Sequence, residues 1–147
     1  MHDPTELILE DDASIHRLLG GARRIAVLGI RSEARADQPA HAVPRYLAGA
    51  GFDVVPVPVY EPEVTHILGR PVFRRVRDVP PPIDLVLVFR RPADIPAHLE
   101  DLIAARPGAV WFQSGIRNDA AALRLAGEGI RVVQDRCARV EHRRMLA

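Results

Sequence analysis

The chain has 147 residues, of which 48% are hydrophobic and 27% charged, and this balance excludes a wholly disordered or collagen-like protein. All 20 basic residues are arginine, so a Walker-type phosphate lysine, a Schiff-base lysine and a lysine general base are excluded. Because 19 acidic residues balance them, the net charge of +1 does not indicate a broad nucleic-acid surface.

The first predicted element is a lead-in helix over residues 11–19, with Asp12 or Ser14 as its N-cap and Gly20-Gly21 as its end. After it, short apolar runs recur at the spacing of βαβ units, which is wider than that of hairpins. Their continuous apolar character is typical of strands buried on both faces of a parallel sheet. The five predicted strands cover residues 25–30, 54–59, 83–89, 109–112 and 130–133.

Stretches with helical character separate these strands, and Gly51, Gly108 and Gly129 stand where C-terminal helix caps are expected. The proline-rich segment 56–82 is predicted as an extended loop with one short strand at Val72-Phe73. The pattern predicts an α/β fold, a Rossmann-like three-layer sandwich with a mainly parallel sheet of five or six strands, as one domain over residues 1–147. The predicted helices cover residues 42–50, 93–105, 118–128 and 139–146.

A candidate phosphate loop follows the first strand, because ligands of such sheets bind beyond the carboxyl ends of the strands. Gly29 permits a sharp turn, Ile30 and its neighbours offer N–H groups, Ser32 adds a hydroxyl and Arg31 a planar cation. A purely structural turn glycine is the open alternative. The chain has no second or third glycine after Gly29, and no acid ends the second strand, so a nicotinamide cofactor is disfavoured.

The third and fourth strands end at the same predicted rim. Phe89 could wall an apolar slot for adenine, Arg90 or Arg91 could meet a phosphate, and Gly115 could bring main-chain donors close to a ligand. The alternatives are that Phe89 belongs to the core, that the arginines pair with Asp94 and Glu100, and that Gly115 is a turn. We also consider His41 and Arg45 as phosphate contacts, against a backbone-satisfied histidine and a solvent-facing arginine.

Taken together, these segments resemble the stand-alone CoA-binding proteins related to the nucleotide domain of the succinyl-CoA synthetase alpha subunit. The resemblance covers nearly all of residues 24–146 and is carried by IAVLGI-RS, QPAHAVPRYLAGAGFDVVPV, IDLVLVFRRPADIP, AVWFQSGI and VVQDRCARVEHRR. It implies a Rossmann-like fold that binds CoA or an acyl-CoA. By position, the resemblance implies Gly29, Ile30, Arg31 and Ser32 at the pyrophosphate, Phe89 and Arg90 at the adenosine half, and Ser114, Gly115 and Ile116 along the pantetheine.

The chain departs from that family at the end of the second strand, where members usually carry Asn-Pro and this sequence has Pro58-Val59. The resemblance therefore does not supply the contact expected from that asparagine side chain. We predict a non-catalytic CoA carrier or sensor. The alternative is an acyl-CoA thioesterase or acyl-transfer enzyme that uses Cys137 and His142, although residues five apart on a helix point to different sides. A scaffold with a vestigial pocket is a third option.

No metal site is predicted, because the six histidines are dispersed and Cys137 is the single cysteine. The acidic N-terminus does not resemble a secretory signal, and no apolar run reaches membrane-spanning length, so a cytoplasmic location is expected. The expected partners are the CoA ligand and, as a further option, a protein, without nucleic acid or membrane. Either a monomer or a homodimer is compatible with the sequence.

Overall fold

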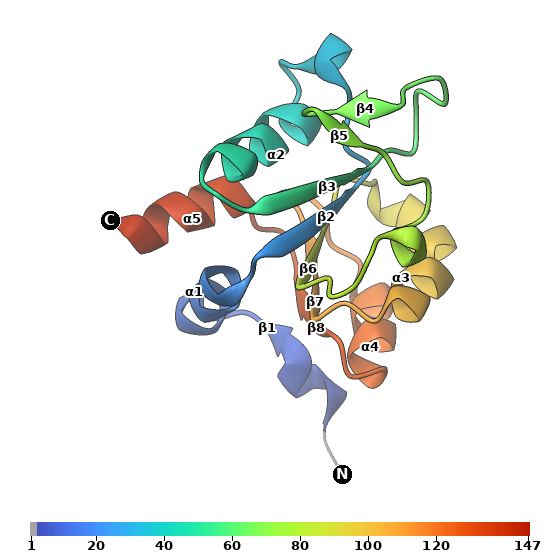
Figure 1. The fold of residues 1–147 in the computed structure, drawn as a ribbon. Coiled ribbons are helices and arrows are strands. Elements are labelled where there is room, and N and C mark those ends of the chain that lie inside the picture. The colour runs from blue at the N-terminus through green and yellow to red at the C-terminus, as the bar shows by residue number, and fades with distance from the viewer. Residues whose placement is uncertain (1–2) are drawn as a thin grey trace.

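A six-stranded sheet forms the centre of the structure, a computed structural model that describes residues 3–147 (Figure 1). Its strands lie in the order β1-β8-β7-β6-β2-β3, and every neighbouring pair is parallel. In chain order the strands are β1 (Ile8–Leu9), β2 (Arg24–Leu28), β3 (Asp53–Val57), β6 (Leu85–Val88), β7 (Ala109–Phe112) and β8 (Arg131–Val133). The α-helices are α1 (Asp12–Gly21), α2 (Pro39–Gly49), α3 (Leu99–Ala105), α4 (Asp119–Gly127) and α5 (Ala138–Leu146).

The helices cover both faces of this sheet, with α1, α2 and α5 on one side and α3 and α4 on the other (Figure 1). Successive residues of β2 point to opposite faces, as the pleat requires. Ile25 and Val27 pack with the first group of helices, whereas Ala26 and Leu28 pack with the second. All four are at most 2% exposed. The predicted α/β Rossmann-like sandwich and its doubly buried strands are therefore confirmed.

The strand order changes direction at β2, which lies between β3 and β6. The loops that follow β2 and β6 lead to opposite faces of the sheet, so a crevice is expected between their carboxyl ends. Gly29 ends β2 there with a φ of +87°, and its N–H donates to the Val57 carbonyl at 2.9 Å. A Cβ on Gly29 would stand only 2.3 Å from the carbonyl oxygen of Phe89. Glycine is thus required where the two strand ends meet.

The N-terminal part of the chain differs from the sequence-based expectation in two ways. Strand β1 was not predicted; it pairs with β8 through only two residues. Helix α1 is capped by Asp11, whose carboxylate accepts from the Ser14 N–H at 2.9 Å, so the predicted caps Asp12 and Ser14 are wrong. The helix ends at Gly21, the second glycine of the predicted end.

The predicted helix over residues 93–105 is divided into a 3-10 segment (Pro92–His98) and α3. Pro96 has no N–H for an α-helical hydrogen bond, which explains the tighter first part. Gly51 and Gly129 adopt the positive φ expected after a helix, but after α3 this conformation belongs to Arg106, with a φ of +50°. The cap predicted at Gly108 is wrong. A Cβ there would approach the Asp84 carbonyl oxygen to 2.8 Å, so this glycine serves chain packing.

The proline-rich segment contains a small antiparallel hairpin of β4 (His66–Ile67) and β5 (Arg70–Pro71). The strand predicted at Val72-Phe73 therefore lies two residues earlier in the chain. The turn between β4 and β5 consists of Leu68 and Gly69, both with positive φ. Pro56 and Val57 belong to β3, and the rest of the segment is irregular apart from one 3-10 turn (Val76–Asp78).

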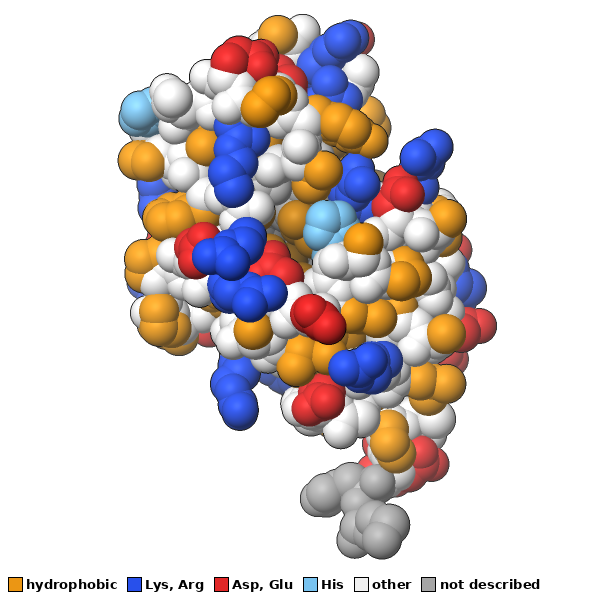
Figure 2. Space-filling view, turned by 90° about the vertical axis from the view of Figure 1, so that its right-hand side faces the viewer, with side chains coloured by type: hydrophobic (Ala, Val, Ile, Leu, Met, Phe, Trp, Pro, Cys, Tyr) orange, Lys and Arg blue, Asp and Glu red, His pale blue; other side chains and the backbone are white. Residues whose placement is uncertain are grey.

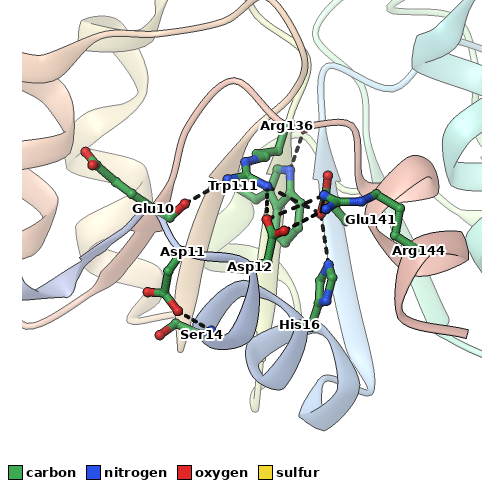
Figure 3. Close-up of polar contacts among 9 residues, drawn as sticks. All are labelled: Glu10, Asp11, Asp12, Ser14, His16, Trp111, Arg136, Glu141 and Arg144. Atoms are coloured by element: carbon green, nitrogen blue, oxygen red, sulfur yellow. Dashed lines mark hydrogen bonds and ion pairs between the residues drawn. The ribbon is translucent and has the colours of Figure 1, made fainter. Parts of the chain in front are cut away.

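A network of charged side chains joins α1, α5 and the end of β8 (Figure 3). Glu141 is its centre: the carboxylate lies 2.8 Å from Arg144, 2.9 Å from His16 and 3.4 Å from Arg136. The same two arginines bind Asp12, and the hydrogen bond from Arg144, then that from Arg136, lowers the Asp12 pKa to about 2. The network holds α5 against α1.

Candidate functional site

The candidate site lies at the carboxyl edge of the sheet, where the loops after β2, β6 and β7 come together. The carboxyl ends of β2 and β3 point toward the right-hand side of Figure 1, the side that faces the viewer in Figure 2. Arginine and acidic side chains are interspersed on this face, without a broad region of one charge. An anionic ligand would therefore be recognised by a few local donors.

Several donors of the loop after β2 are engaged within the chain. The Arg31 N–H donates to the Ala40 carbonyl at 3.0 Å, and the Gly29 N–H is bound by Val57. Ile30 is fully buried. The Ser32 N–H and hydroxyl and the Arg31 guanidinium are all directed toward one acceptor.

That acceptor is the carboxylate of Glu61, which follows β3. Its Oε1 accepts from the Ser32 N–H at 3.1 Å and from Arg31 Nε at 3.2 Å, and its Oε2 accepts from the Ser32 hydroxyl. The hydrogen bond from the Ser32 side chain, together with the nearby Arg31 cation, lowers the Glu61 pKa below its usual range. The loop therefore already binds one anion, supplied by the chain itself.

Tyr60 connects the loops after β2 and β6. The residue is 48% exposed, and its ring lies beneath two guanidinium groups, with centroid distances of 5.0 Å to Arg31 and 5.3 Å to Arg90. Arg90 Nε donates to Nε2 of His98 at 3.1 Å, and a second Arg90 nitrogen lies 3.7 Å from Asp94. The pairing with Asp94 considered from the sequence is thus observed.

Burial, and after it the Arg90 cation, lower the pKa of His98 below its ordinary value of about 6.5. As pH falls through about 6.5, the unfolded chain takes up this proton first, so the free energy of unfolding decreases until the folded-state pKa is passed. We expect His98→Gln to lose less stability than the parent protein between about pH 7.5 and 5.5 in urea titrations. Equal losses in both proteins would contradict the lowered pKa.

The two residues considered along α2 occupy different environments. His41 is 2% exposed, and its Nε2 lies 2.8 Å from the Glu33 carboxylate. The same carboxylate accepts from the Leu68 N–H at 3.0 Å, so His41 and Glu33 tie the loop to the β4–β5 turn. His41 Nδ1 has no hydrogen-bond partner within residues 3–147. Arg45 is exposed and faces solvent.

The loop after β7 has Ser114 and Gly115 exposed and Ile116 half-buried. The Gly115 N–H donates to Asp135 Oδ1 at 2.7 Å, and the Ile116 N–H donates to the Gln113 carbonyl at 2.9 Å. A second internal carboxylate therefore binds a main-chain donor at this edge. Gly115 has a φ of +82°, which fits the turn considered from the sequence.

The structure does not bring Cys137 and His142 together: no hydrogen bond or ion pair joins them in residues 3–147. His142 Nδ1 lies 2.8 Å from the Tyr46 hydroxyl, and its ring packs edge-on against Phe52. His142 borders a hollow next to Asp53, at the amino-terminal ends of β2 and β3, opposite the loops of the candidate site. Cys137 packs against the core at the start of α5.

Tyr60, Glu61 and Asp135 contact the loops of the candidate site and were not predicted from the sequence. Glu61 lies two residues beyond Pro58-Val59, the position where the chain departs from its family. The signal available was an acid shortly after the second strand, although too far along for a ribose contact. Its role depends on a contact across 29 residues of chain, which no local pattern reveals.

Residues 3–147 contain no group of three or more His, Cys, Asp and Glu side chains that could hold a metal ion. Among the helices of that range, none combines the length and hydropathy needed to span a bilayer.

Comparison with known proteins identifies the family. The chain is 32% identical to the uncharacterized protein YneT of Bacillus subtilis, over 88% of this chain and 93% of that protein. It is similar to the structure of cell-free ID.343 from Thermus thermophilus, with 39% identity, a TM-score of 0.84 and coverage of 92% of this chain and 99% of the other. A hypothetical protein from Pyrococcus horikoshii OT3 has 31% identity, a TM-score of 0.83 and coverage of 94% of each chain.

Residues 23–143 match the CoA binding domain, which is most of the chain. The matched range begins immediately before β2 and ends within α5, so it includes all three loops of the candidate site. The chain therefore belongs to the CoA binding domain family.

Proposed function

We propose that the chain binds coenzyme A or an acyl-CoA at the carboxyl edge of the sheet, as one domain, and acts as a non-catalytic carrier or sensor. The observation that carries the proposal is the Glu61 carboxylate on Ser32 and Arg31. A loop that binds a carboxylate through an N–H, a hydroxyl and a guanidinium has the donors that a phosphate needs. CoA carries a pyrophosphate and a 3′-phosphate, so this donor set fits the ligand of the family.

In this proposal the residues 29–32 bind the pyrophosphate, Phe89 and Arg90 border the adenosine half, and residues 114–116 line the pantetheine. His41 is assigned to support of the first loop through Glu33, and Arg45 to an outer charged contact. The position of the β2 loop at the switch in strand order supports the assignment.

Replacing Arg31 by alanine is expected to weaken CoA binding by about 10- to 100-fold, because a charge-assisted hydrogen bond contributes about 1.5–3 kcal/mol. Calorimetric titration measures the change, and NAD should bind the parent protein much more weakly than CoA. Arg124→Ala provides the control, since this exposed arginine lies on α4, away from the loops. Absence of saturable CoA binding by the parent protein at millimolar ligand would reject the proposal.

A further inference from the structure

Glu61 occupies the donors that the proposed ligand needs. Its side chain is only 16% exposed, although it lies on an irregular segment between β3 and β4. Each of its carboxylate oxygens accepts from Ser32, and one of them also accepts from Arg31. A phosphate oxygen placed on the Ser32 N–H would meet this carboxylate directly, and two anions in contact repel each other. Ligand and carboxylate therefore exclude each other at this position.

The segment that presents Glu61 is shaped for this contact. Glu61 has a φ of +58°, a left-handed conformation that side chains other than glycine adopt at a cost. Arg74 stabilises the turn: it donates to the carbonyls of Glu61 and Pro62 at 3.1 Å and to that of Val64 at 2.6 Å. Arg74 thus holds the backbone of this turn, whereas the Glu61 carboxylate, within residues 3–147, accepts hydrogen bonds from Arg31 and Ser32 alone.

The neighbouring residue couples this contact to the second loop. Tyr60 lies beneath both Arg31 and Arg90, the two arginines assigned to the ligand. If the Glu61 carboxylate withdraws, the Arg31 guanidinium loses this acceptor. The ring of Tyr60, the residue next to Glu61, contacts both Arg31 and Arg90. One short segment therefore contacts the donors of two strand ends.

We propose that Glu61 is an internal competitor for the ligand phosphate: its carboxylate keeps the Arg31–Ser32 donors ordered and is displaced when CoA binds. This inference rests on the proposed function, because it names the residue that sets the affinity of that same site. Small anions that engage only this loop must displace the carboxylate without other contacts. A ligand that also reaches the loops after β6 and β7 gains further interactions that offset the displacement. The expected consequence is selection for the large nucleotide over free phosphates.

The test compares Glu61→Gln with Glu63→Gln by calorimetric titration with CoA. The amide retains the shape of the carboxylate but loses its charge, so CoA should bind at least about tenfold more tightly than it binds the parent protein. Glu63→Gln removes the same charge from a side chain two residues further along, which is exposed and forms no ion pair within residues 3–147. This variant should change the dissociation constant by less than about twofold. Unchanged or weaker binding by Glu61→Gln would overturn the inference.

Inorganic pyrophosphate separates this inference from the proposed function. If neither protein binds CoA, the proposed function fails, and the inference then stands only if Glu61→Gln binds pyrophosphate at least about tenfold more tightly than the parent protein does. Where Glu61→Gln does not fold, carbon NMR of the parent protein decides. Displacement requires the Glu61 carboxyl group to titrate at a higher pH when CoA is saturating than when it is absent. An unchanged titration would assign Glu61 a structural role and refute the competition.

Discussion

Replacing Gly29 by alanine is expected to lower the free energy of unfolding by about 2 to 5 kcal/mol. Two costs combine at this position. A non-glycine residue at a φ of +87° is strained, and the new Cβ would stand 2.3 Å from the Phe89 carbonyl oxygen, so the ends of β2 and β6 must separate. Their separation would disturb the Phe89 N–H bond to Leu28, which measures 2.9 Å. Urea denaturation followed by the emission of Trp111, the single and fully buried tryptophan, measures the loss.

Gly49→Ala is the matched control, because it adds the same methyl group at the end of α2. Apart from its chain neighbours and the backbone of its own helix, no heavy atom of residues 3–147 lies within 4 Å of its Cβ position, and the residue is helical. This substitution should be neutral or stabilise the protein by up to about 1 kcal/mol. If Gly29→Ala were as stable as Gly49→Ala, the loop after β2 would be freer to move than its contact with Phe89 indicates.

The strands of the sheet could be predicted because their signal is local and strong. The runs are predominantly apolar, and residues 109–112 are apolar at every position, which is typical of an element buried on both faces. The intervals between runs leave room for a crossover helix. The parallel order followed from the connections. Strand β1 escaped prediction because two residues carry no detectable period, and its pairing with β8 is determined by tertiary contacts.

Errors at the element ends arose from choices between neighbouring residues. Asp11, Asp12 and Ser14 are all good N-cap types, and the difference lies in which carboxylate is free to turn back to the helix. Asp12 is instead used by Arg136 and Arg144, which lie more than 120 residues further along the chain. Similarly, Gly108 resembled a cap in the sequence, but it is required by contact with Asp84.

The sequence indicates which strand ends form the candidate site, but not which groups accept hydrogen bonds from its donors. Parallel strands present their carboxyl ends on one side of the sheet, so the ends of the first, third and fourth strands lie along that side. The internal acceptors, Glu61 and Asp135, were not predictable, since both lie on irregular segments and both have positive φ. The Ser32 and Gly115 N–H groups are bound by carboxylates 29 and 20 residues away in the chain, so their partners depend on long-range contacts. Local pattern identifies a donor, whereas only the fold shows what it donates to.

Replacing Glu141 by alanine is expected to lower the free energy of unfolding by about 2 to 3 kcal/mol. Its side chain is 5% exposed and joins three basic side chains, from α1, the end of β8 and α5 (Figure 3). Without the carboxylate, Arg136 and His16 lose their buried acceptor, although both remain partly hydrated at 25% and 22% exposure. This hydration keeps the loss below the 3–5 kcal/mol typical of breaking a fully buried ion pair.

Asp12→Ala provides the comparison, because Asp12 binds the same two arginines but is half exposed. Solvent and salt screen an exposed pair more than a buried one, so the Asp12 variant should lose less stability, and its loss should shrink at high salt. The Glu141 loss should persist in high salt. Urea titrations at low and high salt, read by the emission of Trp111, whose Nε1 donates to the Arg136 carbonyl at 2.7 Å, measure both effects. If the two variants behaved alike, burial of Glu141 would not be what makes the network stabilising.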